Sequence, residues 1–320
     1  MTFFRNIRRT VHILWCVPFF AFLCSSCFTG VESTRKIGRS DVRHQKAAEQ
    51  SAEQRYLSSI LPERLGSWSP GKEFLVSDER IKVIFTPASN PLPLSVGDTL
   101  RFVKTEEVVS PVGKATDLYF SRSQDTSPYI YRINSSLDEI LQRDQVEIPF
   151  TVEMSIPRGV DEKLRGKEFY VITPRWFDLN GNLSTRIKYI PVKIIDVLPG
   201  NHEFPVKIIF SPIFKGFNDN DRFAFYMSVG NTTTSSRNFE TLFSLKNPRD
   251  KYPAITDEIW DYIIQNRVKE GMTRDEARLA LGSPVDVDRG HDYSSVYERW
   301  TYDGGVYLIF RDGFLETFRR

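Results

Sequence analysis

The stretch GMTRDEARLALGSP, residues 271–284, carries the strongest folding signals in the chain. Thr273 and Glu276 have the spacing of a capping box, in which each side chain bonds the backbone N–H of the other at the start of a helix. Ala and Leu residues then give the helix a small apolar face. Gly282 permits the positive φ that commonly ends a helix, and Pro284 prevents its continuation. The stretch therefore predicts one short helix that packs closely on a neighbouring layer.

The residues on either side of this helix complete a small α+β unit. Thr256 precedes two acids and an apolar stripe at helical spacing, which predicts an earlier helix. Downstream, runs of alternating aromatic and β-branched residues separated by Gly-containing turns predict three antiparallel strands. These strands are expected at Tyr297–Tyr302, Val306–Phe310 and Phe314–Phe318. The fold class predicted for residues 255–320 is an ααβββ layer sandwich.

Four short motifs in this unit resemble the BamE/SmpA-like domain of bacterial lipoproteins. They are Gly271-Met272-Thr273, Leu281-Gly282-Ser283-Pro284, Arg299-Trp300-x-Tyr302 and Phe310-x-x-Gly313-x-Leu315. The resemblance implies an outer-membrane accessory protein that contacts protein partners and anionic lipid and has no catalytic activity. The loop Asp286–Val296 does not match the family pattern, and neither does the long region that precedes the unit.

Residues 66–245 are predicted to be rich in β structure, in one unit or in two units of about 66–150 and 166–245. Asn180-Gly181 is a strong hairpin signal, because both central residues must accept positive φ. Residues 166–229 resemble an SH3-like small barrel, and an immunoglobulin-like sandwich is the alternative fold. A short helix is expected near 137–142. Strands are expected at Arg80–Phe85, Thr99–Val103, Thr116–Phe120, Tyr129–Ile133, Glu168–Thr173, Tyr189–Ile195, Val206–Phe210 and Phe223–Val229.

All three cysteines lie near the N-terminus, at Cys16, Cys24 and Cys27. Three arginines within residues 1–9 are followed by an apolar run of 14 residues. A membrane-spanning helix needs about 20 apolar residues, so this shorter run is typical of a signal peptide. An ordinary secretory signal and an uncleaved anchor are the alternatives.

Ser25-Ser26-Cys27 resembles the exit of a bacterial lipoprotein signal, in which a diacylglycerol is attached to the cysteine and the peptide is cut just before it. The bulky Trp15 and Leu23 precede the other two cysteines and disfavour them. We therefore expect a signal peptide at 1–26 and lipid on Cys27. Because Phe28 stands where Asp would retain an inner-membrane lipoprotein, the resemblance implies the outer membrane, on its periplasm-facing side.

Residues 27–65 are polar and are expected to form a tether that holds the folded part away from the lipid surface. The whole chain of 320 residues has 43 basic and 41 acidic residues. Three of the basic residues lie in the signal segment, so the remainder has no positive surplus to follow a phosphate backbone. Nucleic acid is therefore not an expected partner, and no cofactor or metal is expected.

Three groups of residues are candidate sites: a His-Asp pair, two Asp/Asn-rich loops and one face of the C-terminal sheet. His291 beside Asp292 suggests a general base, but no nucleophile-elbow pattern surrounds Ser283, Ser294 or Ser295, so a polar loop is the favoured interpretation. Asp178–Asn182 and Asn218–Asp221 offer oxygen ligands for calcium, although turn chemistry explains both. One face of the C-terminal sheet packs on the helices, and the other is either open or covered by the β-rich region. The predicted binding residues are Tyr307, Ile309, Leu315, Phe314, His291 and Tyr293.

The expected function is binding: a lipid-anchored adaptor or accessory protein in outer-membrane assembly or maintenance, with envelope proteins as partners. Arg311, Arg319 and Arg320 are candidates for contact with anionic lipid headgroups, but a solvated end of the chain is the favoured interpretation. The alternative is a glycan-binding module, an enzyme inhibitor or an envelope enzyme that uses the β-rich region.

Overall fold

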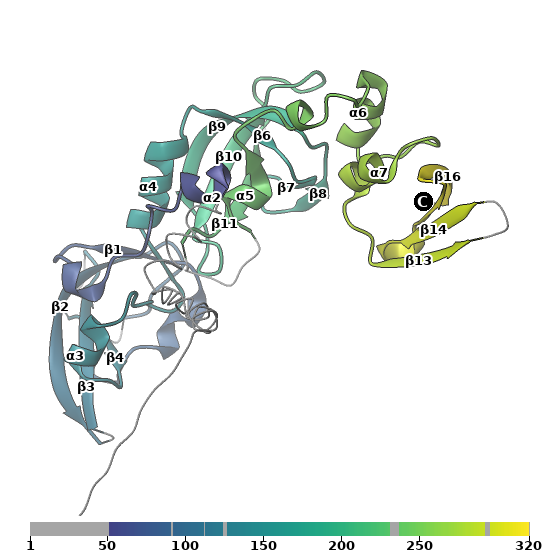
Figure 1. Cartoon of the computed structure of the whole chain (residues 1–320). Coiled ribbons are helices and arrows are strands. Elements are labelled where there is room, and N and C mark those ends of the chain that lie inside the picture. Colours follow the sequence, from purple (N-terminus) through teal and green to yellow (C-terminus); the bar gives the residue numbers. More distant parts are fainter. Residues whose placement is uncertain are drawn as a thin grey trace, which may run out of the picture. The chain divides into compact units, whose positions relative to one another are not determined.

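The computed structural model describes residues 51–90, 92–111, 113–123, 127–230, 237–291 and 295–319. The predicted signal peptide, Cys27 and most of the predicted tether lie outside these residues. The described part of the chain is mostly β and contains three antiparallel sheets and a few helices (Figure 1).

The first sheet has five strands in the spatial order β4-β3-β2-β1-β5. Leu100 and Phe102 of β2 and Leu118 and Phe120 of β3 are buried in its core. The predicted strands at 99–103, 116–120 and 129–133 are present, and so is the helix at 137–142, now α3. The bounds are β1 (Glu73–Val76), β2 (Thr99–Ser110), β3 (Gly113–Ser121), β4 (Tyr129–Ile133), β5 (Thr151–Glu153), α3 (Leu137–Leu141) and the 3₁₀ turns η1 (Leu65–Ser67) and η2 (Glu79–Val83).

The second sheet has seven strands in the order β12-β6-β9-β10-β11-β7-β8 and curls into a half-barrel around an apolar cluster. The Asn180-Gly181 turn joins β7 to β8 as predicted, and Gly181 has a φ of 89°. The bounds are β6 (Glu168–Val171), β7 (Arg175–Phe177), β8 (Leu183–Thr185), β9 (Ile190–Pro199), β10 (Val206–Pro212), β11 (Phe223–Met227), β12 (Phe243–Ser244), α2 (Ala52–Tyr56), α4 (Ser155–Leu164) and α5 (Phe239–Leu242).

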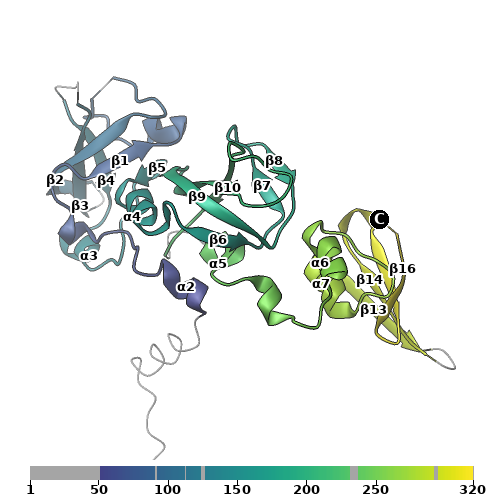
Figure 2. The ribbon, with the colours of Figure 1, turned by 90° about the horizontal axis from the view of Figure 1, so that it is seen from above.

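Helix α4 packs against β9 and β10 and was not predicted from the sequence (Figures 1 and 2). Ile156, Val160 and Leu164 recur every four residues and are buried in the cluster of the second sheet. Pro157 lies in the first turn, where its missing N–H leaves no helical hydrogen bond unmade. Packing of this apolar stripe outweighs the weak helix propensity of the segment.

The third sheet has the order β13-β14-β15-β16, and α6 and α7 cover one of its faces (Figure 2). The predicted caps are present, because the side chains of Thr256 and Thr273 accept hydrogen bonds from the third residue of their helices. Gly282 ends α7 with a φ of 87°. The bounds are α6 (Asp257–Ile264), α7 (Arg274–Leu281), β13 (Asp286–His291), β14 (Val296–Thr301), β15 (Tyr307–Arg311), β16 (Phe314–Arg319) and the 3₁₀ turns η3 (Pro248–Lys251) and η4 (Asp303–Gly305).

Two sequence predictions about elements were wrong. The strand expected at 80–85 is instead the turn η2, because the Asp78 side chain accepts the Arg80 N–H at 2.8 Å and diverts the backbone from a ladder. The C-terminal sheet has four strands rather than three. The unmatched loop contains β13, whose Asp286–His291 pairs with Thr301–Val296 of β14.

The predicted tether is too long, because residues 51–65 belong to the folded body. Leu57, which follows α2, is buried in the cluster of the second sheet, and Leu65 is buried in that of the first. Tyr56 stacks on Phe239 with ring centroids 5.0 Å apart. These apolar side chains are few and widely spaced, so composition alone did not separate them from a solvated linker.

We expect Leu57→Ala to lower the free energy of unfolding by about 2–4 kcal/mol, because it removes buried methyl groups and leaves a cavity. Leu61→Ala is the matched control, since Leu61 is 57% exposed, and should change stability by less than about 0.5 kcal/mol. Urea unfolding followed by tryptophan fluorescence measures both. Equal midpoints for the two variants would show that residues 51–65 are not integral to the fold.

Candidate functional site

The face of the C-terminal sheet opposite α6 and α7 is set by strand register. Trp300 pairs with Leu308, and both are buried against the helices. Because side chains alternate along a strand, Tyr307 and Ile309 lie on the opposite face, as predicted. Phe314 pairs with Arg311 on that same face and is 56% exposed. We call the residues Arg299, Tyr307, Ile309, Arg311, Phe314 and Arg319 the outer face.

Leu315 was predicted on this face and is instead in the core, only 2% exposed. The pairing of β15 with β16 shifts between Ile309 and Phe310, so that Phe310 pairs with Leu315 while Ile309 pairs with Thr317. Leu315 therefore faces the core together with Phe310, and the bulge, at Glu316, comes after it and brings Thr317 to the outer face. The prediction was wrong because it placed two consecutive residues, Phe314 and Leu315, on one face, whereas neighbouring side chains of a strand point to opposite faces.

The outer face is amphipathic rather than an apolar patch. The Arg299 guanidinium lies 5.1 Å from the centroid of the Tyr307 ring, a cation–π distance. Arg311 forms an ion pair of 3.0 Å with Glu316. At the β13 edge the Tyr297 ring covers Gly290, where a Cβ atom would lie 2.4 Å from the ring and could not be accommodated. Aromatic and arginine side chains are thus held side by side on a rigid sheet.

The other predicted binding residues are less well placed. His291 is exposed at the end of β13, where it pairs with Val296 at the edge of the sheet. Tyr293, like Asp292 and Ser294, lies outside the described residues.

A buried carboxylate on the inner side of β14 was not predicted. Glu298 accepts the indole N–H of Trp300 at 2.9 Å and pairs with Arg274 at 3.2 Å and Arg289 at 3.3 Å. Burial acts to raise the pKa of Glu298, but the Trp300 hydrogen bond and the two guanidinium charges outweigh it, so the pKa is lowered. The cluster joins α7 to β13 and β14 and is structural in character.

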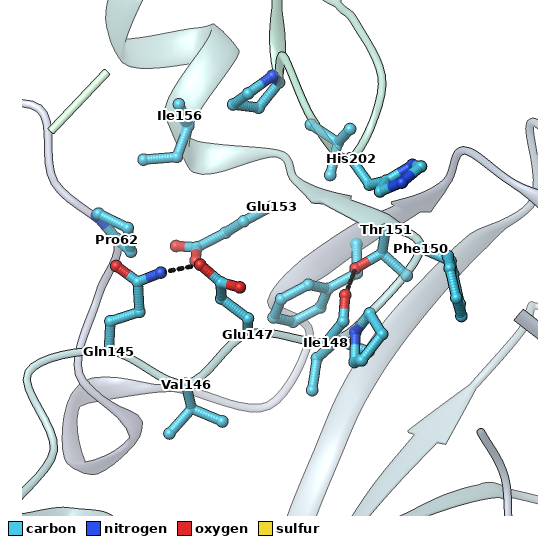
Figure 3. A pocket seen from close by; sticks show the side chains of 14 residues that line it. Pro62, Gln145, Val146, Glu147, Ile148, Phe150, Thr151, Glu153, Ile156 and His202 are labelled. Carbon is cyan, nitrogen blue, oxygen red and sulfur yellow. Dashed lines mark hydrogen bonds between the residues drawn. The ribbon is translucent and has the colours of Figure 1, made fainter. Parts of the chain in front are cut away.

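A cavity of about 250 Å³ lies between α4, β5 and the β9–β10 turn (Figure 3). Its walls are mostly apolar, and Gln145, Glu147 and Glu153 supply polar groups, with the Gln145 amide donating to Glu147. The Glu153 carboxylate accepts Lys72 Nζ at 2.6 Å and Ser155 Oγ at 2.7 Å. A pocket with apolar walls and a few fixed polar groups has the character of a small-ligand site.

Phe150 on the wall of this cavity has a φ of 63°, which is unusual for a bulky residue. Its carbonyl accepts both the N–H and the hydroxyl of Ser77, at 2.9 and 3.0 Å, and these bonds hold the conformation. The ring lies between the Arg80 guanidinium, 4.7 Å from its centroid, and the His202 ring at 5.6 Å. Strain of this kind is concentrated at binding sites more than elsewhere.

Where the second sheet meets the C-terminal helices, Lys188 is 5% exposed. Its Nζ donates to the carbonyl of Ala280 in the last turn of α7 at 2.9 Å, where the helix dipole favours a cation. Burial lowers the pKa of Lys188 to about 8 from its ordinary value of 10.5. Sequence reasoning missed this residue, because a lone lysine beside a predicted strand is ordinarily a solvated side chain.

Within the described residues, no three His, Cys, Asp or Glu side chains are grouped so that they could hold a metal ion. The Asp178 side chain accepts the backbone and side-chain N–H groups of Asn182, both at 2.8 Å, which is turn chemistry. In the same part of the chain, no helix combines the length and the apolar character that crossing a bilayer requires.

Comparisons of the chain with models of protein families, with curated proteins and with solved structures found no match.

The buried lysine predicts a specific pH dependence of stability. Between pH 8 and 10.5 the unfolded chain binds a proton at Lys188 that the folded chain does not, so the free energy of unfolding should rise with pH in this window, by up to about 3 kcal/mol. Lys188→Met removes the titration. Urea unfolding at a series of pH values measures the difference between the two chains, in which their shared titrations cancel.

The exposed Lys246 provides the control, because Lys246→Met should track the wild-type chain at every pH. If the difference in the free energy of unfolding between the wild-type and Lys188→Met chains stays constant from pH 8 to 10.5, the pH dependence does not come from Lys188.

Proposed function

We propose that this chain is a lipid-anchored adaptor of the bacterial envelope that acts by binding other proteins in outer-membrane assembly or maintenance, without catalysis. The observation that carries the proposal is the outer face, where Tyr307, Ile309 and Phe314 lie among three arginines. Aromatic residues and arginine are enriched where proteins bind one another, and they carry most of the binding energy.

The opposite side of the same sheet supports this interpretation. Trp300, Leu308 and Phe310 are buried against α6 and α7 and hold the strands in place. The outer side chains therefore project from a preorganised surface, which limits the conformational entropy lost on binding. An adaptor needs this rigidity more than it needs converging acid and base groups.

The anchor rests on the resemblance of Ser25-Ser26-Cys27 to a lipoprotein signal. With lipid on Cys27 and the fold beginning near residue 51, the intervening residues 28–50 have a maximum reach of about 80 Å when fully extended. That reach lets the outer face meet partners at a range of distances from an outer membrane while the chain stays attached to it.

The test is site-specific photo-crosslinking in cells. Benzoyl-phenylalanine replaces Phe314 with little change in character, and Phe214, an exposed aromatic in the loop between β10 and β11, is the matched control. We expect position 314 to crosslink to a discrete envelope protein and position 214 not to do so. Mass spectrometry identifies the product. In a Cys27→Ser chain, the product should fall sharply because the protein is no longer held at the membrane.

Equal crosslinking from positions 314 and 214 would contradict the adaptor function. An unchanged yield and membrane fractionation in the Cys27→Ser chain would contradict the lipid anchor instead, so the two parts of the proposal are separable.

The cavity of Figure 3 favours a second candidate, a glycan-binding function of the β-rich region. Sugars bind through an aromatic side chain together with carboxylate and amide groups, and Phe150, Glu147 and Gln145 offer this combination on its lining.

If this function holds, chitotetraose should bind in isothermal titration calorimetry. Phe150→Gly keeps the positive φ accessible and removes the ring, so it should weaken binding by roughly tenfold. Phe214→Ala is the control and should bind as the wild-type chain does. No measurable heat with chitotetraose would count against the glycan candidate.

A further inference from the structure

A second cavity, of about 470 Å³, lies where the β6–β7 connection at 172–174 and the β8–β9 connection at 185–189 meet Asn266 and the end of α7. Ile172, Pro174 and Leu281 give it apolar walls, and Thr173, Thr185 and Thr241 add hydroxyl groups. All of its lining residues belong to the described chain, and none of them is acidic. Lys188 and Arg278 supply positive charge.

The Lys188 ammonium is incompletely satisfied in this wall. An ammonium has three N–H donors. The bond to the Ala280 carbonyl occupies one of them, and Nζ also lies 5.1 Å from the centroid of the Tyr189 ring, but neither contact supplies a counter-ion. Among the described residues no carboxylate lies within ion-pair distance, and burial alone shifts its pKa. By contrast, Arg278 already pairs with Asp275 at 3.1 Å. A buried cation without a counter-ion is costly, so an anion supplied from outside would be bound favourably.

Asn266 adds an independent observation. It is 9% exposed, and its Oδ1 has no hydrogen-bond partner in the described chain, whereas its Nδ2 donates to the Arg186 carbonyl at 2.7 Å. An unpaired buried acceptor costs about 1–3 kcal/mol and is uncommon in folded proteins. Asn266 is one of the lining residues, so the wall of the cavity contains an acceptor that needs a donor in addition to a cation that needs an anion.

The backbone is strained at the same place. Asn266 has a φ of 57° and Tyr189, which also lines the cavity, has a φ of 58°. Positive φ is rare for a residue as bulky as tyrosine, and such conformations are concentrated at binding sites. The Tyr189 N–H is held by the Val171 carbonyl at 2.6 Å, which fixes the turn that directs Lys188 and Tyr189 to this junction.

We infer that this cavity binds an organic carboxylate that carries a neighbouring N–H or O–H group, with the carboxylate on Lys188 and the donor on Asn266 Oδ1.

A monocarboxylate fits better than a phosphate. One free ammonium balances one negative charge, and the remaining cation is already paired with Asp275. The apolar walls suit an organic body next to the charge, which a free phosphate lacks. The contact with Ala280 explains why the lysine is tolerated at a helix end, but it leaves the ammonium without a counter-ion and the Asn266 oxygen without a donor.

The experiment is isothermal titration calorimetry of the full chain with N-acetylglycylglycine, which has a carboxylate beside an amide N–H. The matched probe is N-acetylglycylglycinamide, which lacks only the charge, and lactate and inorganic phosphate are further arms. We expect the free acid or lactate to bind, and the amide and phosphate to bind at least roughly tenfold more weakly, the scale of one charged hydrogen bond.

Lys188→Met should weaken binding of the free acid by roughly tenfold to a hundredfold. Asn266→Asp keeps a residue that tolerates positive φ, adds a negative charge to the lining, and should abolish binding. Because this variant keeps Lys188, it tests the same cavity even if the Lys188→Met chain does not fold. Lys246→Met, an exposed control, should bind normally.

Three results would overturn the inference: no binding of either carboxylate, equal binding of acid and amide, or unchanged affinity in both cavity variants. Binding of phosphate in preference to both carboxylates would also overturn it. The inference does not depend on the adaptor function, because crosslinking from position 314 tests a different surface.

Discussion

Burial of apolar side chains inside the curl of the seven-stranded sheet is the interaction on which the rest of the described fold depends. Its cluster is not closed by its own strands, because Leu57 enters from the N-terminal segment, Val160 from α4 and Ile264 from α6. At about 25 cal/mol per Å² of apolar surface removed from water, each such side chain contributes about 1.5–3 kcal/mol. The contributions from outside the sheet attach the N-terminal segment and α6 to one core. A substitution in this core should therefore destabilise the packing of both elements.

In the C-terminal sheet the strand register decides which side chains are displayed. Leu315 enters the core because it pairs with Phe310, and the bulge that follows at Glu316 brings Thr317 beside Ile309. The outer face is consequently a mixture of aromatic and guanidinium groups and not a continuous apolar patch. Such a mixture favours selective, reversible contacts, since the arginines remain hydrated until a complementary partner arrives. The adaptor proposal and the carboxylate proposal use opposite sides of this module.

The sequence predicted structure correctly where that structure depends only on residues close together in the chain. The caps at Thr256 and Thr273 and the hairpin at Asn180-Gly181 depend on neighbouring residues alone, and all three were predicted. Helix α4 was missed because packing of its apolar stripe on β9 outweighs the weak helix propensity of the segment, which includes Gly159. Lys188 and Asn266 could not be found from spacing, since 78 residues separate them along the chain and only tertiary structure gives them a common cavity.

Strand β13 has a hydrogen-bonded neighbour on one side only, β14, and its other backbone edge is unpaired in the described sheet. Open edges of this kind invite a second copy to add a strand, the first step toward fibrils. The charged side chains of this edge, Asp286, Asp288 and Arg289, are hydrated. A second copy would have to desolvate all three before its strand could pair with β13. The sheet can thus expose aromatic side chains for binding while the charged edge of β13 disfavours aggregation by strand addition.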